Sequence, residues 1–359
     1  MDAPRSTVAQ PVMPATASNS PAPPAMVAGA AGAPAQMPAT GASEDTAGAT
    51  DDAMTATDPA PAEWTWTPTG LPDVSVSMSI SIPAGQEMFR CLYFAMPTDR
   101  GVIAVPAMES HMAAGSHHLV TRRTSLTSIP AGQDQQFDCY ASGSAIVFNE
   151  AGSIYEAQQP DSHRALPSGV AQEFQPGEVL LIIAHYVNVT DAAIEGQVQL
   201  ILHTMDLADV QQEAGTIMFD NTNISLPPGQ KTRVSMTCTL PADFHPALLW
   251  SHMHHWGTHF IATTDDAEAA ATLGTLYDQT DWDEPQPREY PNDPPVTIHA
   301  GNHITFSCDY MNDQTTTITF GASAETNEMC LLHGMYWPRM QNAGAEQCRG
   351  GTTTIEAIP

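Results

Sequence analysis

The stretch SIPAGQEMFRC, residues 81–91, runs from an apolar residue through a glycine turn into a segment that ends at a cysteine. The same design recurs in SIPAGQDQQFDC at 128–139, SLPPGQKTRVSMTC at 225–238 and TIHAGNHITFSC at 297–308. Short apolar segments separated by turns that contain Gly and Pro are typical of strands in antiparallel sheets. We therefore predict strand–turn–strand units of one design and an all-β fold.

The regions around these units support the same fold class. Val74, Val76, Met78, Ile80 and Ile82 alternate with small polar residues, which is the period-2 pattern of a half-buried strand. The segment EAAATLG, residues 268–274, predicts at most a short helix or a loop. The spread of the repeated units indicates two tandem, jelly-roll-like antiparallel β-sandwich domains, which we place at 63–210 and 211–359.

Residues 1–62 of the 359-residue chain differ in composition from the rest. They are almost all Ala, Pro, Thr, Gly, Ser, Met and Val. Such a segment has too few bulky apolar groups to offset the entropy of ordering, so we expect a disordered Ala/Pro-rich tail. The acidic, proline-rich stretch 278–295 predicts a surface loop inside the second domain.

Charge excludes several classes of partner. The formal net charge is −29, and Lys231 is the only lysine. The chain therefore lacks a basic surface that could neutralise phosphates, and we expect no nucleic acid as a partner. An anionic membrane surface would repel it. The sequence contains no apolar run long enough for a transmembrane segment, and its first residues, MDAPRSTVAQ, lack the pattern of a signal peptide.

The six cysteines are widely spaced and form no CxxC pair, which argues against a zinc ribbon or a thioredoxin-like redox site. Their even number suggests three structural disulfides and an oxidising compartment. Six buried free thiols are the alternative.

Histidines cluster in SHMHHWGTH, residues 251–259, although a His-x-His motif alone is weak evidence for a metal site. On a strand, positions i and i+2 face the same side, so His252 and His254 can hold one ion together. His255 points the other way, and we expect it at the surface or supporting a ligand. Adjacent His117 and His118 can bind one ion only at a strand end or bulge, or through different ring nitrogens.

Two further residues have an ordinary interpretation when they are taken alone. His185 interrupts the apolar run LLIIAHYVN, and Met329 lies in TNEMCLLHGMYWP. A single histidine or methionine of this kind is more often part of a core than a ligand. Imidazole with a thioether, however, suits copper that cycles through Cu(I), whereas a thioether is not a usual zinc ligand.

Together, GSHHLV, AHYVN, HMHHWG and NEMC give the order HH, HY, HxHHxG, EMC, and this order resembles the copper type II, ascorbate-dependent monooxygenases. That family includes the peptidylglycine and dopamine enzymes. The connecting phrases RALPSGVAQEF, ISLPPGQ and CDYMN match as well, so the resemblance covers about residues 70–350. It implies two coppers per chain, with ascorbate or another one-electron donor as reductant. The ligands that it implies are His117, His118 and His185 for an electron-transfer copper, and His252, His254 and Met329 for an oxygen-binding copper.

The resemblance also implies the disulfides Cys308–Cys330 and Cys238–Cys348, which leaves Cys91 and Cys139 as the third pair. Where the peptidylglycine enzymes carry an arginine that holds the substrate carboxylate, this chain has Trp250, and His333 replaces a tyrosine. A peptidylglycine substrate is therefore not expected. The phrase MYWP, residues 335–338, is closer to the dopamine enzymes. We place Trp250, His333 and Tyr336 at the substrate.

The sequence thus predicts a monooxygenase whose catalytic residues are His252, His254 and Met329. Its partners would be O₂ and a small organic molecule that is hydroxylated at a C–H bond. We expect a monomer located outside the cytoplasm, either secreted, periplasmic or tethered to the cell surface. Two alternatives remain: a non-catalytic, extracytoplasmic copper-binding or storage protein on the same fold, and a β-sandwich with incidental histidines.

Overall fold

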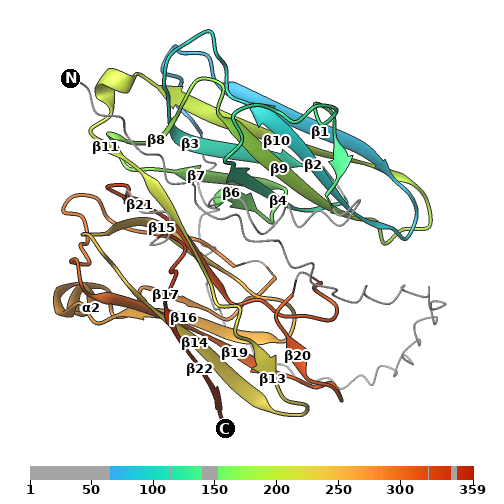
Figure 1. Cartoon of the computed structure of the whole chain (residues 1–359), viewed down its shortest axis with the longest axis vertical. Coiled ribbons are helices and arrows are strands. Elements are labelled where there is room, and N and C mark those ends of the chain that lie inside the picture. The colour runs from blue at the N-terminus through green and yellow to red at the C-terminus, as the bar shows by residue number, and fades with distance from the viewer. Residues whose placement is uncertain (1–64, 114, 140–152, 284, 322, 341–345) are drawn as a thin grey trace, which may run out of the picture. The chain divides into compact units, whose positions relative to one another are not determined.

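Strands make up most of the regular structure in the computed structural model, which describes residues 65–113, 115–139, 153–283, 285–321, 323–340 and 346–359 (Figure 1). Within these ranges, the helical elements are the short helix α2 (Ala267–Leu273) and the 3-10 helix η2 (Leu207–Asp209). The prediction of an all-β fold is confirmed, and α2 is the short helix that EAAATLG allowed. The predicted tail, residues 1–62, lies outside the described residues.

Two sheets form the first half of the described chain. One has the order β1-β10-β3-β8-β11, with β7 also paired to β3, and the other has the order β5-β2-β9-β4-β6. All these pairs are antiparallel except the parallel pair of β11 with β8. The first sheet contains β1 (Val74–Ile82), β3 (Ile103–Met112), β7 (Asp161–Ala165), β8 (Val170–Phe174), β10 (Ile194–Met205) and β11 (Gln212–Glu213). The second contains β2 (Glu87–Ala95), β4 (Ser116–Arg123), β5 (Phe137–Asp138), β6 (Ser153–Ala157) and β9 (Val179–Val187).

Strand β9 is apolar at nearly every position because both of its faces are buried. Leu180 and Ile182 belong to the core between the two sheets, which also takes Met78 of β1 and Met108 of β3. The residues between them, such as Leu181, belong to a second cluster on the other face of the sheet. A strand that is buried on both faces needs apolar residues at every position. His185 lies on the same face of β9 as Leu181, because side chains alternate along a strand.

The second half contains two larger sheets and one small one. Their orders are β12-β21-β15-β18, β17-β16-β19-β14-β22 and β13-β20. A single core that includes Phe219, Leu249, Phe260 and Phe306 takes residues from both larger sheets. The strands are β12 (Gly215–Asp220), β13 (Ser225–Leu226), β14 (Lys231–Thr239), β15 (His245–His252), β16 (Gly257–Thr264), β17 (Tyr277–Gln279), β18 (Arg288–Glu289), β19 (His303–Met311), β20 (Ile318–Thr319), β21 (Leu331–Trp337) and β22 (Thr352–Ala357).

The four repeated phrases share their turn but not all of their strands. Each phrase places a glycine at positive φ: Gly85, Gly132, Gly229 and Gly301. A strand follows each turn, but a strand precedes the turn only in the first and third phrases, so the expectation of a strand on both sides is wrong for the other two. The first turn joins β1 to β2, which lie in different sheets, so it passes the chain across the sandwich.

Three disulfides join the six cysteines: Cys91–Cys139, Cys238–Cys348 and Cys308–Cys330. These are the pairs that the family resemblance implies. Of the described helices, none has the length and apolar character needed to cross a membrane.

Candidate metal centres

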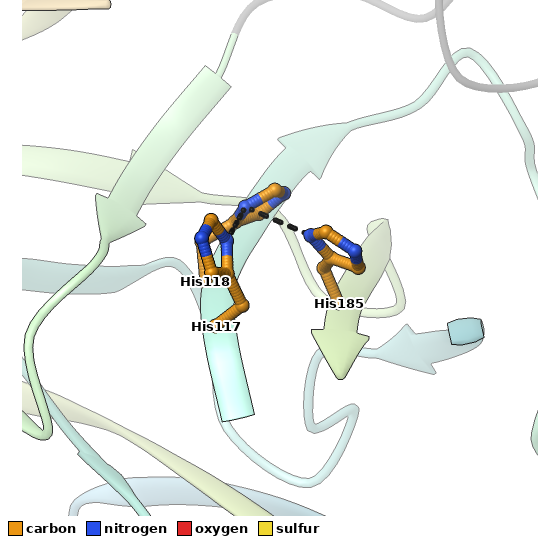
Figure 2. A group of neighbouring side chains, drawn as sticks. All are labelled: His117, His118 and His185. Atoms are coloured by element: carbon orange, nitrogen blue, oxygen red, sulfur yellow. Dashed lines mark hydrogen bonds between the residues drawn. The ribbon is translucent and has the colours of Figure 1, made fainter. Parts of the chain in front are cut away.

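Three imidazoles converge on strands β4 and β9 (Figure 2). The Nδ1 atom of His118 lies 3.1 Å from Nδ1 of His117 and 3.3 Å from Nδ1 of His185. His118 pairs with His185 across the two strands, and the register shifts between Ser116 and His118. The extra residue, His117, therefore lies at a β-bulge, which is one of the two places where adjacent histidines can reach one ion.

The ring of His185 is held from two sides. Phe89 stacks on it with ring centres 3.9 Å apart and planes 6° apart. Its Nε2 atom lies 2.7 Å from a carboxylate oxygen of Glu87. When Nε2–H donates to this carboxylate, the tautomer is fixed and the lone pair of Nδ1 points toward the other two histidines.

These imidazoles are poor bases in the folded protein. Burial, followed by the charge of His117, lowers the pKa of His185 to about 3. Burial and the two neighbouring histidines also hold the pKa of His118 well below its ordinary value. Neutral imidazoles are the form that binds metal, so three of them with adjacent nitrogens fit a copper ion.

The second group lies where β15 ends. His252 is the last residue of this strand, and His254 follows it outside the strand, with ring centres 5.3 Å apart and planes at 86°. Nδ1 of His254 lies 2.8 Å from the carbonyl oxygen of Asn327, so Nε2 of this ring is available for a ligand. Burial lowers the pKa of both His252 and His254. His255 is exposed.

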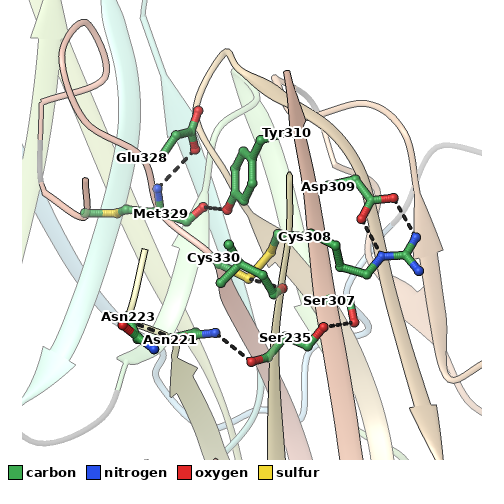
Figure 3. Close-up of a disulfide and its surroundings, with 12 residues drawn as sticks. Asn221, Asn223, Ser235, Ser307, Cys308, Asp309, Tyr310, Glu328, Met329 and Cys330 are labelled. Carbon is green, nitrogen blue, oxygen red and sulfur yellow. Dashed lines mark hydrogen bonds and ion pairs between the residues drawn. A yellow bond between two sulfur atoms is a disulfide. The ribbon is translucent and has the colours of Figure 1, made fainter. Parts of the chain in front are cut away.

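Met329 lines the same cavity as His252 and His254. A buried carboxylate and a disulfide hold its backbone in place (Figure 3). Glu328 is fully buried and accepts from the backbone N–H groups of His254 (2.9 Å), Trp256 (2.9 Å) and Met329 (3.1 Å). Burial raises the pKa of Glu328 to about 7, although the three N–H donors oppose this. Next to Met329, Cys330 is bonded to Cys308, and the hydroxyl of Tyr310 donates to the Met329 carbonyl at 2.7 Å.

Both ligand groups line one cavity of about 430 Å³ within the compact unit Ala62–Pro359. Trp250 and His333 line this cavity as well, but Tyr336 does not. Side chains alternate along β21, so Tyr336 faces the opposite side from His333 and stacks on Phe244 in the core. The structure therefore brings eight of the nine predicted site residues to one cavity and leaves out Tyr336.

Glu156 of β6 links the cavity wall to the second half. Its Oε2 atom lies 2.7 Å from Nδ1 of His333 and accepts from Nε1 of Trp250 at 3.2 Å. Burial alone would lower the pKa of His333, but the charge of Glu156 and hydrogen bonds to Glu156 and Asp220 raise it to about 9. Burial would raise the pKa of Glu156, and the same histidine outweighs this and lowers it. The pair is therefore charged at neutral pH.

Sequence reasoning did not identify the three carboxylates that support this site. Glu328 directly precedes Met329 in the NEMC motif, and Glu87 lies in the first repeated phrase, so both were next to residues already singled out. Glu156 had no such signal, because its partners are 94 and 177 residues away in the chain.

The described residues thus present two donor sets on one cavity, one of three imidazoles and one of two imidazoles with a thioether nearby, which is the ligand chemistry of copper. Residues 212–353 match the family model described as copper type II ascorbate-dependent monooxygenase, C-terminal domain. Over these residues, the match confirms the resemblance that the sequence motifs show. No curated protein matches the chain.

Proposed function

We propose that the protein is a copper-dependent monooxygenase with two mononuclear copper sites. His117, His118 and His185 would hold one ion, and His252, His254 and Met329 would hold the other. The observation that carries this proposal is the pair of unlike donor sets that line one cavity. A protein that only stored copper would have no need of a second site of different composition that faces the same space as the first.

Bound copper would supply one-electron redox chemistry and O₂ activation at these positions. The overall reaction would be R–H + O₂ + 2 e⁻ + 2 H⁺ → R–OH + H₂O, with ascorbate or another one-electron donor as the source of the electrons. The harder, all-imidazole set suits the site that accepts and passes on electrons. The set with the thioether, a soft ligand, favours Cu(I) and suits the site at which O₂ binds.

The chain's own residues would prepare this reaction. Neutral imidazoles offer lone pairs, because burial lowers the pKa of His118, His185, His252 and His254. The aromatic ring of Trp250 would orient the substrate, since it lines the cavity and is held by its hydrogen bond to Glu156. The Glu87 carboxylate would keep the proton of His185 on Nε2.

We further propose two domains, 63–210 and 211–359, each contributing one copper site. Separate hydrophobic cores in the two halves support this division. The short strand β11 pairs with β8, so the connecting segment adds to the sheet of the first half. Three disulfides support a location outside the cytoplasm. We propose a monomer.

Copper titration of the wild type and of His185→Ala, each followed by O₂ uptake with ascorbate, tests the function. The wild type should bind two ions per chain, whereas His185→Ala should bind one and lose coupled turnover. O₂ uptake should rise when a substrate is added from a panel of hydrophobic amines, phenols and acids. Binding of two ions without substrate-dependent O₂ uptake across this panel would instead identify a storage protein, and no stoichiometric binding would leave only incidental histidines.

A further inference from the structure

Arg122 is a buried cation on the wall of the cavity. It lies on β4, on the same face as His118, because the register of β4 with β9 runs without a shift from His118 to Arg123. The residue is 8% exposed and lines the cavity. Its Nε and Nη1 atoms are buried and have no hydrogen-bond partner among the described residues. Burying a guanidinium with unused N–H groups is unfavourable unless a partner arrives.

A second guanidinium lines the same cavity. Arg164 lies over the ring of Trp250, 5.6 Å from its centre. Its two terminal nitrogens donate to the backbone carbonyls of His163 (2.7 Å) and Glu156 (3.2 Å), but its Nε atom is buried without a partner. Both arginines therefore keep at least one N–H group that no described residue uses.

The carboxylates of the cavity do not supply the missing hydrogen bonds, although Glu156 attracts both arginines electrostatically. Glu156 is engaged by Trp250 and His333, and Asp220 also lies against His333. Glu87 and Asp161 lie against His185 and His111, respectively. The remaining lining carboxylate, Glu289, is exposed. Two of the chain's 11 lysines and arginines therefore line one cavity, beside carboxylates that lie against histidines or are exposed.

We infer that Arg122 and Arg164 form an anion-binding site within this cavity, and that its ligand is the carboxylate of a small organic acid. Guanidinium groups match the planar oxygen pair of a carboxylate. The rest of the lining includes the apolar side chains of Phe89, Trp282, Phe320 and Leu331, which fit an aryl or alkyl body. The inference rests on the proposed function only in naming this acid as the substrate.

Equilibrium binding to the full-length, copper-loaded protein, without O₂ or reductant, tests the site by calorimetry. Three probes share one body and differ in the head group: 3-phenylpropionate, its neutral amide, and 3-phenylpropylamine. The wild type should prefer the carboxylate to the amide by about tenfold or more, since a charged hydrogen-bonded pair is lost in the amide. Arg122→Gln should reduce this preference to about onefold, and Arg164→Gln should weaken it.

Arg90→Gln is the matched control. Arg90 also has a buried Nε without a partner, but it does not line the cavity, so this variant should keep the full preference. Thermal unfolding of Arg122→Met gives a second readout, because Nε and Nη1 of Arg122 make no hydrogen bond that this change would remove, and losing its attraction to Glu156 should lower the melting temperature only slightly. A large decrease would mean that Arg122 serves the fold, and would overturn the inference.

Equal binding of carboxylate and amide by the wild type, or a preference that survives in Arg122→Gln, would also overturn it. Ascorbate is itself an anion, so a competition experiment tests whether it binds at the same arginines. If ascorbate displaces 3-phenylpropionate and loses affinity in Arg122→Gln while the substrate acid does not, the site serves the reductant and the substrate assignment fails. The binding assay needs no turnover, so it tests the anion-binding site separately from the proposed function. If the protein prefers the carboxylate but never consumes O₂, the proposed function is wrong and the anion-binding site still stands.

Discussion

The two groups of proposed ligands differ in how the fold positions them. The first group, His117, His118 and His185, comes from paired strands. Nδ1 of His118 lies 3.1 Å from Nδ1 of His117 and 3.3 Å from Nδ1 of His185. His252 and His254 lie at and after a strand end, with ring centres 5.3 Å apart. The thioether of the second group comes from a segment before β21, held by local bonds.

The difference teaches that one group depends on sheet register and the other on local braces. In the first group, strand pairing brings the histidines together, and Phe89 and Glu87 orient the ring of His185. In the second, the carboxylate of Glu328 and the Cys308–Cys330 disulfide fix the residues beside the ligands. Damage to Glu328 or to the Cys308–Cys330 disulfide should therefore affect the second group more than the first.

Met329→Ile should produce the largest effect. We expect loss of nearly all hydroxylation, because isoleucine keeps the apolar volume but has no sulfur to bind Cu(I). X-ray absorption of the reduced protein should lose its copper–sulfur contribution, while the ion at His117, His118 and His185 stays bound. Met335→Ile is the control, since Met335 is buried in an apolar cluster with Leu248 and Trp250. A sulfur signal that survives in the first variant and disappears in the second would show that the ligand is misassigned.

Removing the Cys308–Cys330 bond, by replacing both cysteines with alanine, should come next. The disulfide closes a loop with a sequence separation of 22 residues, and its loss should cost about 2–5 kcal/mol in the free energy of unfolding, measured with urea. Copper affinity should fall more at the Met329 site than at the three-histidine site. The Cys91–Cys139 bond lies in the first half, so replacing both of these cysteines should lower copper affinity more at the three-histidine site than at the Met329 site. If both variants lost copper affinity equally at the two sites, the two groups would not depend on separate supports.

The His333–Glu156 pair should give a smaller effect that depends on pH. The pKa of His333 is raised from 6.5 to about 9 in the folded protein, so its contribution to stability is fully present below 6.5 and is lost as the pH rises through about 9. We expect the stability difference between wild type and His333→Gln to shrink by about 1–3 kcal/mol across this window. Urea unfolding at a series of pH values measures it. A difference that stays constant across this window would mean that folding does not raise the pKa of His333.

Much of the fold and most of the site could be predicted from the sequence, because these features have local signals. Alternation identified β1, the His-x-His spacing identified His252 and His254, and the order of the motifs gave the resemblance that implied the other ligand candidates. The misplaced residue, Tyr336, could have been corrected by the same alternation, since it is an odd number of positions from His333. Contacts such as Glu156 with His333, separated by 177 residues, depend on sheet order and leave no local pattern.

Glu87→Gln should produce the smallest effect, and it should be confined to the three-histidine site. The amide oxygen of glutamine can still accept from Nε2 of His185, but the negative charge that strengthens this bond is lost. Because carboxylates that support histidine ligands typically contribute about 10–100-fold to metal affinity, and because Glu87 is half-exposed, we expect a loss near the lower limit, about tenfold. Competition with a copper chelator would measure it. Glu195→Gln, an exposed change on β10, is the control and should leave both affinities unchanged. An equal loss at the Met329 site would show that the two groups are coupled, and that sheet register and local braces do not act separately.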